Sequence, residues 1–174
     1  MAKDLPDKVT KTQAAIRPAK SGDFEELLAL VEAYYKFDSI AFDERGTAAA
    51  LRRLLRDKSL GRAWVIDAGH ALAGYAILTF NYDLEFGGVE GILTDMFVAA
   101  RFRRKQFGAQ LIGAVRDFCE AAGINTMELQ VTRSNWGARL FYKALGFNES
   151  NRIVLSLEIA RSSSARLPFK EPKS

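Results

Sequence analysis

The chain has 174 residues, of which 48% are hydrophobic and 26% charged, a composition ordinary for one globular domain with its own core. Its single cysteine and single histidine exclude an intrachain disulfide, a zinc site built from Cys and His, and a catalytic triad centred on His. No apolar run approaches the ~20 residues of a membrane span, and the N-terminus lacks the apolar block of a signal peptide. We therefore expect a cytoplasmic protein with no membrane partner.

The net charge of +4 comes from the two ends of the chain. Residues 1–15 contribute +1 and residues 161–174 contribute +3, so the body between them is balanced. Within the body, residues 23–95 hold seven basic and thirteen acidic side chains, and residues 96–160 hold nine basic and five acidic ones. Solvated surface explains most of these charges. The polarity also suits a cationic substrate on one half and an anionic cofactor on the other, and we expect no nucleic-acid partner.

Hydrophobic periodicity predicts alternating helices and strands between two polar tails. Ser21 or Asp23 can cap the first helix, where Asp23 and Glu26 fit a capping box, and Thr47 is the expected cap of the second. In chain order the sequence predicts a tail at 1–13, a strand at 14–18, a helix from 24, a loop at 37–46, a second helix, strands at 63–67 and 72–80 around a turn, a loop at 81–88, a strand at 91–98, a helix at 106–122, a strand at 126–132, a helix at 135–145, a strand at 152–159 and a tail at 161–174.

This order of elements indicates an α/β (α+β) fold with a mixed sheet. The strand at 91–98, the helix at 106–122 and the strand at 126–132 form a βαβ unit, so we expect the two strands to be parallel. A basic turn, Arg101 to Gly108, joins the strand to the helix. Unpaired N–H groups at a helix N-terminus favour phosphate, although the helix dipole contributes only ~0.3–1 kcal/mol, so Arg and Lys must supply much of the attraction.

Two segments resemble the GNAT superfamily of acetyl-CoA-dependent N-acetyltransferases, and the resemblance spans about residues 14–160. The basic turn is similar to the family signature Arg/Gln-x-x-Gly-x-Gly/Ala, with Gln106 where the first glycine is expected. Segments 84–88 and 94–98 resemble members that acetylate small amines, including diamine acetyltransferases. The stretch VTRSNWGARLFYKALGF at 131–147 is similar to the family's Asn-x-x-Ala-x-x-Phe-Tyr-x-x-x-Gly-Phe, matched by Asn135, Ala138, Phe141, Tyr142, Gly146 and Phe147.

The resemblance implies one domain over 14–160 with a mixed, mostly antiparallel central sheet flanked by helices. It also implies acetyl-CoA as co-substrate and no metal. The pantetheine arm would run along the backbone of Phe97 and Val98, and Asn135 would steady it. We expect Gln106 to donate its backbone N–H from ordinary helical geometry. The diphosphate would be held by Arg103, Arg104, Lys105, Gln106, Phe107, Gly108 and Ala109.

Acetyl transfer needs a deprotonated amine, a polarised thioester carbonyl and a proton for the departing thiolate. The resemblance makes Tyr142 the general acid, because a phenol of pKa ~10 can return a proton to a thiolate of pKa ~8.5. The alternative for Tyr142 is a core aromatic. Asp95 is the candidate base, acting directly or through water, although its reference pKa of ~3.9 makes it weak unless burial raises that value. A structural or amine-binding carboxylate is the alternative for Asp95.

Acidic and aromatic side chains are the candidates for binding the acceptor. A lysine-like amine of pKa ~10.4 is mostly protonated at neutral pH, so Glu85 and Asp38 could attract it and Tyr35 could line its pocket. The alternatives are loop surface for Asp38 and core packing for Tyr35. We expect direct transfer from acetyl-CoA to a small cationic amine in a ternary complex. The alternatives are a protein or peptide N-acetyltransferase and a non-catalytic acyl-CoA-binding regulatory module; the resemblance also suggests a homodimer.

Overall fold

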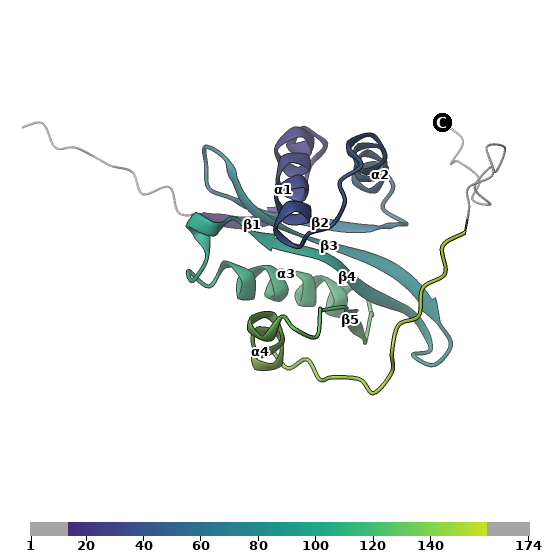
Figure 1. Ribbon diagram of the computed structural model, residues 1–174. Helices are drawn as coiled ribbons and strands as arrows, with labels where there is room; N and C mark the ends of the chain where they lie inside the picture. Colours follow the sequence, from purple (N-terminus) through teal and green to yellow (C-terminus); the bar gives the residue numbers. More distant parts are fainter. Residues whose placement is uncertain (1–13, 160–174) are drawn as a thin grey trace, which may run out of the picture. The chain divides into compact units, whose positions relative to one another are not determined.

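The computed structural model describes residues 14–159 (Figure 1). Both predicted tails, at 1–13 and beyond 160, lie outside the described residues. Contacts divide the chain into two compact units, one ending at Trp136 and one beginning at Gly137, and each is described by itself. No helix among the described residues is long and apolar enough to cross a membrane.

The first unit is built on a five-stranded sheet in the order β1-β2-β3-β4-β5. The strands are β1 (Ala15–Pro18), β2 (Gly61–Asp67), β3 (Leu72–Asp83), β4 (Gly88–Val98) and β5 (Met127–Leu129). The first four are antiparallel to their neighbours, whereas β5 runs parallel to β4. The mixed, mostly antiparallel sheet is thus confirmed, and so is the parallel pair. Strand β5 is shorter than predicted, since it spans three residues of the predicted 126–132.

Helices cover both faces of the sheet (Figure 1). The helical elements are η1 (Ser21–Asp23), α1 (Phe24–Phe37), α2 (Glu44–Arg56), η2 (Ala100–Phe102), α3 (Phe107–Ala121) and α4 (Trp136–Ala144). On one face, apolar residues at helical spacing in α1 and α2 pack against alternate residues of the strands. That core includes Leu27, Val31, Leu51, Leu55, Val65, Tyr75, Ile77 and Phe97.

The opposite face is covered by α3. The ring of Phe118 lies 5.5 Å from that of Trp64 and 6.1 Å from that of Phe80, measured between centroids. Leu111 and Val115 of α3 are fully buried. Because successive side chains of a strand point to opposite faces, β2 and β3 supply both cores, and their burial is nearly continuous.

The second helix begins earlier than predicted. Thr47 was the expected cap, but α2 starts at Glu44 and its N-cap is Asp43, whose carboxylate accepts a hydrogen bond from the Gly46 N–H at 3.2 Å. Asp at the N-cap satisfies a backbone donor that would otherwise lack a partner. The predicted loop at 81–88 is shorter in the structure and spans only residues 84–87, because β3 and β4 continue as a hairpin to the pair of Asp83 with Gly88.

The predicted last strand at 152–159 is wrong. Its alternating apolar residues match the period of a strand, but no strand of the described chain pairs with it. Leu155 and Leu157 are 86% and 85% exposed. Alternation alone does not make a strand, since a strand is stable only when a neighbour accepts its backbone hydrogen bonds.

Candidate functional site

The pairing between strands β4 and β5 ends halfway along β4. The parallel pairing ends at the pair of Leu93 with Leu129, whereas β4 continues to Val98. At the same place β4 bulges, because Leu78 of β3 opposes Leu93 and the next residue, Ile77, opposes Asp95. Thr94 is the extra residue of this bulge. The end of β4 therefore has β3 on one side and, among the described residues, no strand on the other.

The register decides which backbone groups of β4 face this open side. The Ala99 N–H donates to the Ala73 carbonyl at 2.9 Å, so Ala99 turns its backbone toward β3. Backbone groups alternate in direction along a strand, so Phe97 also faces β3, and Met96 and Val98 face away. Phe97 was predicted to hold the pantetheine arm through its backbone, and that role stays a prediction. The residues whose backbone groups face the open side are Val98 and Met96, and the sequence analysis did not name Met96 because a bulge cannot be located from periodicity.

The turn after β4 has a left-handed backbone at two positions that are not glycine. Arg104 has φ of 61° and Gln106 has φ of 64°. The expectation of ordinary helical geometry for Gln106 is thus wrong, and the backbone there adopts the conformation that glycine favours. Within the described chain, the N–H groups of residues 104–109 donate to no protein acceptor. These donors gather at the N-terminus of α3, an arrangement that suits an anion.

The side chain of Arg103 contacts β4 and α1, and so it connects this turn to both elements. Its Nε donates to the Val98 carbonyl at 2.8 Å. Its guanidinium carbon lies 4.5 Å from the ring centroid of Phe37 and 5.4 Å from that of Phe97, both cation–π distances. The side chains of Arg104 and Lys105, by contrast, are exposed. Arg103 therefore orders this turn, and the exposed positive charge comes from the two residues after it, of which Lys105 places its Nζ 5.7 Å from the ring centroid of Phe102.

Asp95 lies on the face of the sheet that α1 covers, because it pairs with Ile77, a residue of the core on that face. It is partly buried, and burial raises its pKa to about 6. The pKa of the Tyr35 phenol is raised mainly by burial and then by the nearby charge of the same Asp95 carboxylate. Tyr34 has a pKa of about 12, raised by burial and then by Asp38 and Asp95. Three of the predicted residues, Asp95, Tyr35 and Asp38, thus lie in one electrostatic neighbourhood.

Tyr75 is a member of this neighbourhood that the sequence analysis did not single out. Burial raises the pKa of its phenol above the usual range, and Asp95 is the next cause. Tyr75 pairs with Phe97 across β3 and β4, which puts it on the same face as Asp95. Only the pairing of the strands shows that Tyr75 lies near Asp95. In the sequence Tyr75 stands in a run of buried strand residues, where it is not distinguished from a core aromatic.

Glu85 lies elsewhere. It is in the turn between β3 and β4, whereas Asp95 pairs with Ile77, six residues before the end of β3. At the rise of a β-strand this separation is about 20 Å along the hairpin. The structure therefore does not bring Glu85 together with Asp95, Tyr35 and Asp38.

The remaining predicted residues belong to α4 and its start. Asn135 directly precedes the helix, and its backbone N–H donates to the Thr132 carbonyl at 2.8 Å. Within the second unit, the ring of Tyr142 lies 5.2 Å from Phe141 and 5.5 Å from Phe147, both edge to face. Gly146 has φ of 95°, as expected of a residue that ends a helix. The roles of Asn135 and Tyr142 remain predictions.

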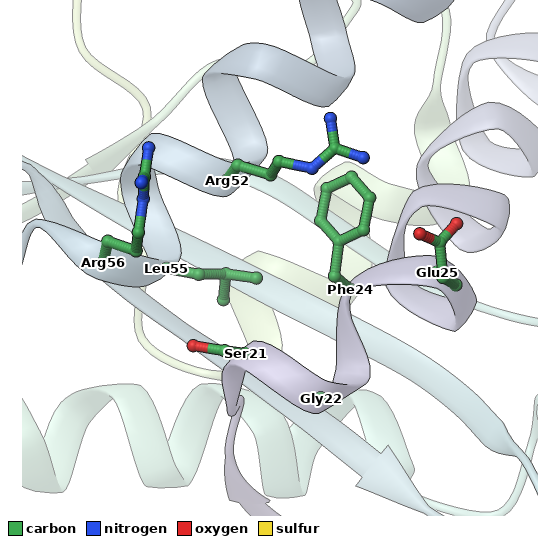
Figure 2. Close-up of a pocket in the computed structure, with 7 residues that line it drawn as sticks. All are labelled: Ser21, Gly22, Phe24, Glu25, Arg52, Leu55 and Arg56. Carbon is green, nitrogen blue, oxygen red and sulfur yellow. The ribbon is translucent and has the colours of Figure 1, made fainter.

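A surface pocket of about 370 Å³ lies between the start of α1 and the end of α2 (Figure 2). The Arg52 guanidinium lies over the Phe24 ring at 4.0 Å, and Arg56 and Glu25 border the opening. Phe24 and Tyr35 are eleven residues apart on α1, which is about 16 Å along a helix. The pocket is therefore separate from the Asp95 neighbourhood. Its lining carries two arginines and one glutamate, and this mixture of charges does not indicate one class of ligand.

Comparisons with known proteins agree with this architecture. The profile of the "Acetyltransferase (GNAT) family" matches residues 25–147. The "Uncharacterized N-acetyltransferase YhfO" of Bacillus subtilis (strain 168) is 28% identical over 140 residues, which are 80% of this chain and 93% of that protein.

Two solved structures share the fold. The integron cassette protein HFX_CASS3 from the Cole Harbour Salt Marsh metagenome has a TM-score of 0.75 and 29% identity, over 84% of this chain and 91% of that one. The aminoglycoside N-acetyltransferase AAC(6')-Iy in complex with CoA has a TM-score of 0.74 and 20% identity, over 84% and 95%. The family profile covers most of the chain and includes β4, the turn with unpaired donors and α4. This protein is therefore an acetyltransferase and belongs to the GNAT family.

Proposed function

We propose that this acetyltransferase moves an acetyl group from acetyl-CoA to the primary amine of a small cationic acceptor. The observation that carries the proposal is the end of β4. Its open side offers the backbone of Met96 and Val98, and its α1 face offers the Asp95 carboxylate one residue before them. A thioester on one side of this strand end and an amine on the other would meet at the bulge.

The cofactor side fits coenzyme A by its donors. The unpartnered N–H groups of residues 104–109 match a diphosphate, which accepts several hydrogen bonds and carries negative charge. The Val98 N–H and both backbone groups of Met96 match the amides of a pantetheine arm, which pair as a strand would. Exposed Arg104 and Lys105 add the charge that a helix N-terminus alone does not supply.

The acceptor side fits a cationic amine. Asp95, with a pKa of about 6, is largely ionised at neutral pH and is a stronger base than an exposed aspartate. It would take a proton from the ammonium directly or through water. The amine nitrogen then attacks the thioester carbon, the carbon–sulfur bond of the tetrahedral intermediate breaks, and the thiolate takes a proton from Tyr142. The second proton that the nitrogen loses on becoming an amide restores the Tyr142 phenol, and Asp95 releases its proton to solvent. Asp38 and Tyr35 would hold the cation near Asp95.

The aminoglycoside acetyltransferase among the similar structures suggests which amines to test first. Aminoglycosides are polycationic, and that protein shares the fold, although its identity of 20% does not transfer its substrate. Polyamines and aminoglycosides are therefore the first acceptors of the panel, with lysine analogues and peptides beside them.

The test has two parts. Isothermal titration should show one acetyl-CoA bound per chain, and thiol release should be fastest with a small polycation. Titration with dephospho-CoA is a control for the role of the diphosphate, because it retains that group and should still bind. Release with peptides alone would make the protein a peptide N-acetyltransferase. Tight acetyl-CoA binding without release for any amine would make it a binding module.

A further inference from the structure

The hydroxyl of Tyr75 is buried without a hydrogen-bond partner in the described part of the chain. Its side chain is fully buried, at 0% exposure. Buried hydroxyl groups almost always have a partner, and one without a protein partner commonly binds an ordered water. A phenylalanine would fill the same space in the core, so packing does not explain the hydroxyl.

The strand register places Tyr75 next to Asp95 on one face of the sheet. Tyr75 opposes Phe97 and Ile77 opposes Asp95, so Tyr75 and Asp95 are diagonal neighbours on one face of the hairpin. Diagonal neighbours lie about 7–8 Å apart, which is within reach of a tyrosine side chain. The two side chains nevertheless form no direct hydrogen bond, because the Tyr75 hydroxyl has no partner. A hydrogen-bonded link between the two side chains therefore requires a bridging group.

We propose that the Tyr75 hydroxyl is a positioning residue for acetyl transfer, holding a water molecule that also hydrogen-bonds the Asp95 carboxylate. The proposal rests on the proposed function. The acceptor ammonium gives a proton to this water, the water gives one of its protons to a carboxylate oxygen of Asp95, and the Tyr75 hydroxyl keeps its own proton. The amine nitrogen is then neutral and attacks the thioester, and the water is regenerated.

The other titratable groups around Asp95 come from α1 and from the turn after β4. From α1 these are the phenols of Tyr34 and Tyr35, whose pKa values lie above the usual range, and Asp38 at the helix end, which acts on Tyr34. Arg103 is the cation on this face, held over Phe97 and Phe37. Burial puts the pKa of Asp95 at about 6, so we assign the acidic limb of the pH profile to this carboxylate.

The experiment compares Tyr75→Phe with the wild type. We expect kcat to fall about tenfold, a part of the ~10²–10⁴ that positioned proton transfer contributes, with the KM for acetyl-CoA unchanged. The acidic limb of kcat/KM should move to higher pH by about half a unit or more, since Asp95 loses a hydrogen bond that favours its charged form. Tyr82→Phe is the matched control: it removes a phenol from the same strand at an exposed position and should change neither value.

A second measurement does not depend on activity. The side-chain carboxyl pKa of Asp95, followed by ¹³C NMR, should be higher in Tyr75→Phe than in the wild type and unchanged in Tyr82→Phe. An unchanged Asp95 pKa, or an unchanged acidic limb with full kcat, would overturn the role of Tyr75. If the wild type acetylates no amine, the proposed function fails, and the NMR comparison still decides whether Tyr75 and Asp95 are linked.

Discussion

Gln106 is strained at the place where a phosphate-binding turn needs an unusual backbone. Its φ of 64° lies in the left-handed region, which costs a residue with a Cβ roughly 1 kcal/mol. Gln106→Gly should relieve this strain, offset partly by the greater freedom of glycine in the unfolded chain. We expect the free energy of unfolding in urea to rise by about 0.5–1 kcal/mol and acetyl-CoA to bind as tightly or more tightly.

The control for Gln106 is its neighbour in the first turn of α3. Gln110 is exposed and has ordinary helical geometry, so Gln110→Gly should lower the free energy of unfolding by about 1 kcal/mol. The same loss in Gln106→Gly would mean that its left-handed backbone carries no strain.

Asp95 should reduce stability at the pH at which it works. Burial raises its pKa to about 6 in the folded chain, against ~3.9 unfolded, so folding disfavours the charged form. Below pH ~4 Asp95 is protonated in both the folded and the unfolded state, so its burial costs no charge penalty. Between pH ~4 and about 6 the unfolded state ionises first and the folded state is progressively destabilised, and above pH 6 the full penalty is present. Asp95→Asn should therefore be more stable than the wild type at pH 8 by on the order of 1–3 kcal/mol, and this difference should vanish near pH 4.

Urea unfolding at pH 8, 6 and 4 measures this difference. Asp38→Asn is the control, because Asp38 is exposed at the end of α1 and its change should bring no pH-dependent gain. A constant difference between Asp95→Asn and the wild type across the three pH values would contradict the burial of a working carboxylate.

Single residues were predictable from the sequence where a local motif marks them. Asp95 precedes an apolar strand end, and Gln106 interrupts a glycine pattern, so both could be named. The left-handed backbone of Gln106 could not, since helical geometry is the default for glutamine. The place of Tyr75 next to Asp95 and the direction of the Met96 backbone depend on which strand residues face each other, and that information lies in the strand pairing and its bulge at Thr94.

At the scale of elements, the close approach of β3 and β4 holds the open strand end in place. A Cβ added at Gly74 would lie 2.5 Å from the Phe97 carbonyl oxygen and 2.7 Å from the Ile66 Cδ1. Gly74→Ala must therefore push β4 away from β3, and Val98 pairs directly with Gly74. We expect a loss of about 1–3 kcal/mol in the free energy of unfolding and weaker acetyl-CoA binding, measured by urea and titration.

Gly113→Ala is the matched control. Nothing lies within 4 Å of the Cβ that this change adds to α3, so it should raise the free energy of unfolding by about 0.5–1 kcal/mol and leave acetyl-CoA binding unchanged. Equal effects of the two substitutions would show that contact between β3 and β4 does not shape the cofactor side.

Helices and strands were predictable where the hydrophobic pattern of the segment itself indicates one type of structure. The amphipathic periods of α1 and α3 and the buried runs of β2 and β3 each indicate one structure. Boundaries failed where a side chain competes, as with Asp43, whose carboxylate caps α2 before Thr47. The segment 152–159 failed because a strand needs a partner, and its alternation says nothing about where one would lie.

At the scale of the whole molecule, the βαβ order of the sequence was enough to predict a parallel pair in an otherwise antiparallel sheet. Right-handed, short connections leave few ways to place the strand after α3. The charge division along the chain has a structural counterpart in the first unit. The acidic Asp95 neighbourhood lies on the α1 face, and the basic turn with its unpartnered donors lies at the N-terminus of α3.

The kinetic mechanism is the last consequence of this architecture. An enzyme that stores the acetyl group needs a nucleophile, and the sequence has one cysteine. Cys119 is 5% exposed on the core side of α3, and burial raises the pKa of its thiol, so it is neither accessible nor readily ionised. Initial rates against both substrates should therefore give intersecting lines, and mass spectrometry should find no acetyl adduct after incubation with acetyl-CoA alone. Cys119→Ala should keep its kcat; parallel lines or a stable acetyl-protein would instead require a covalent intermediate.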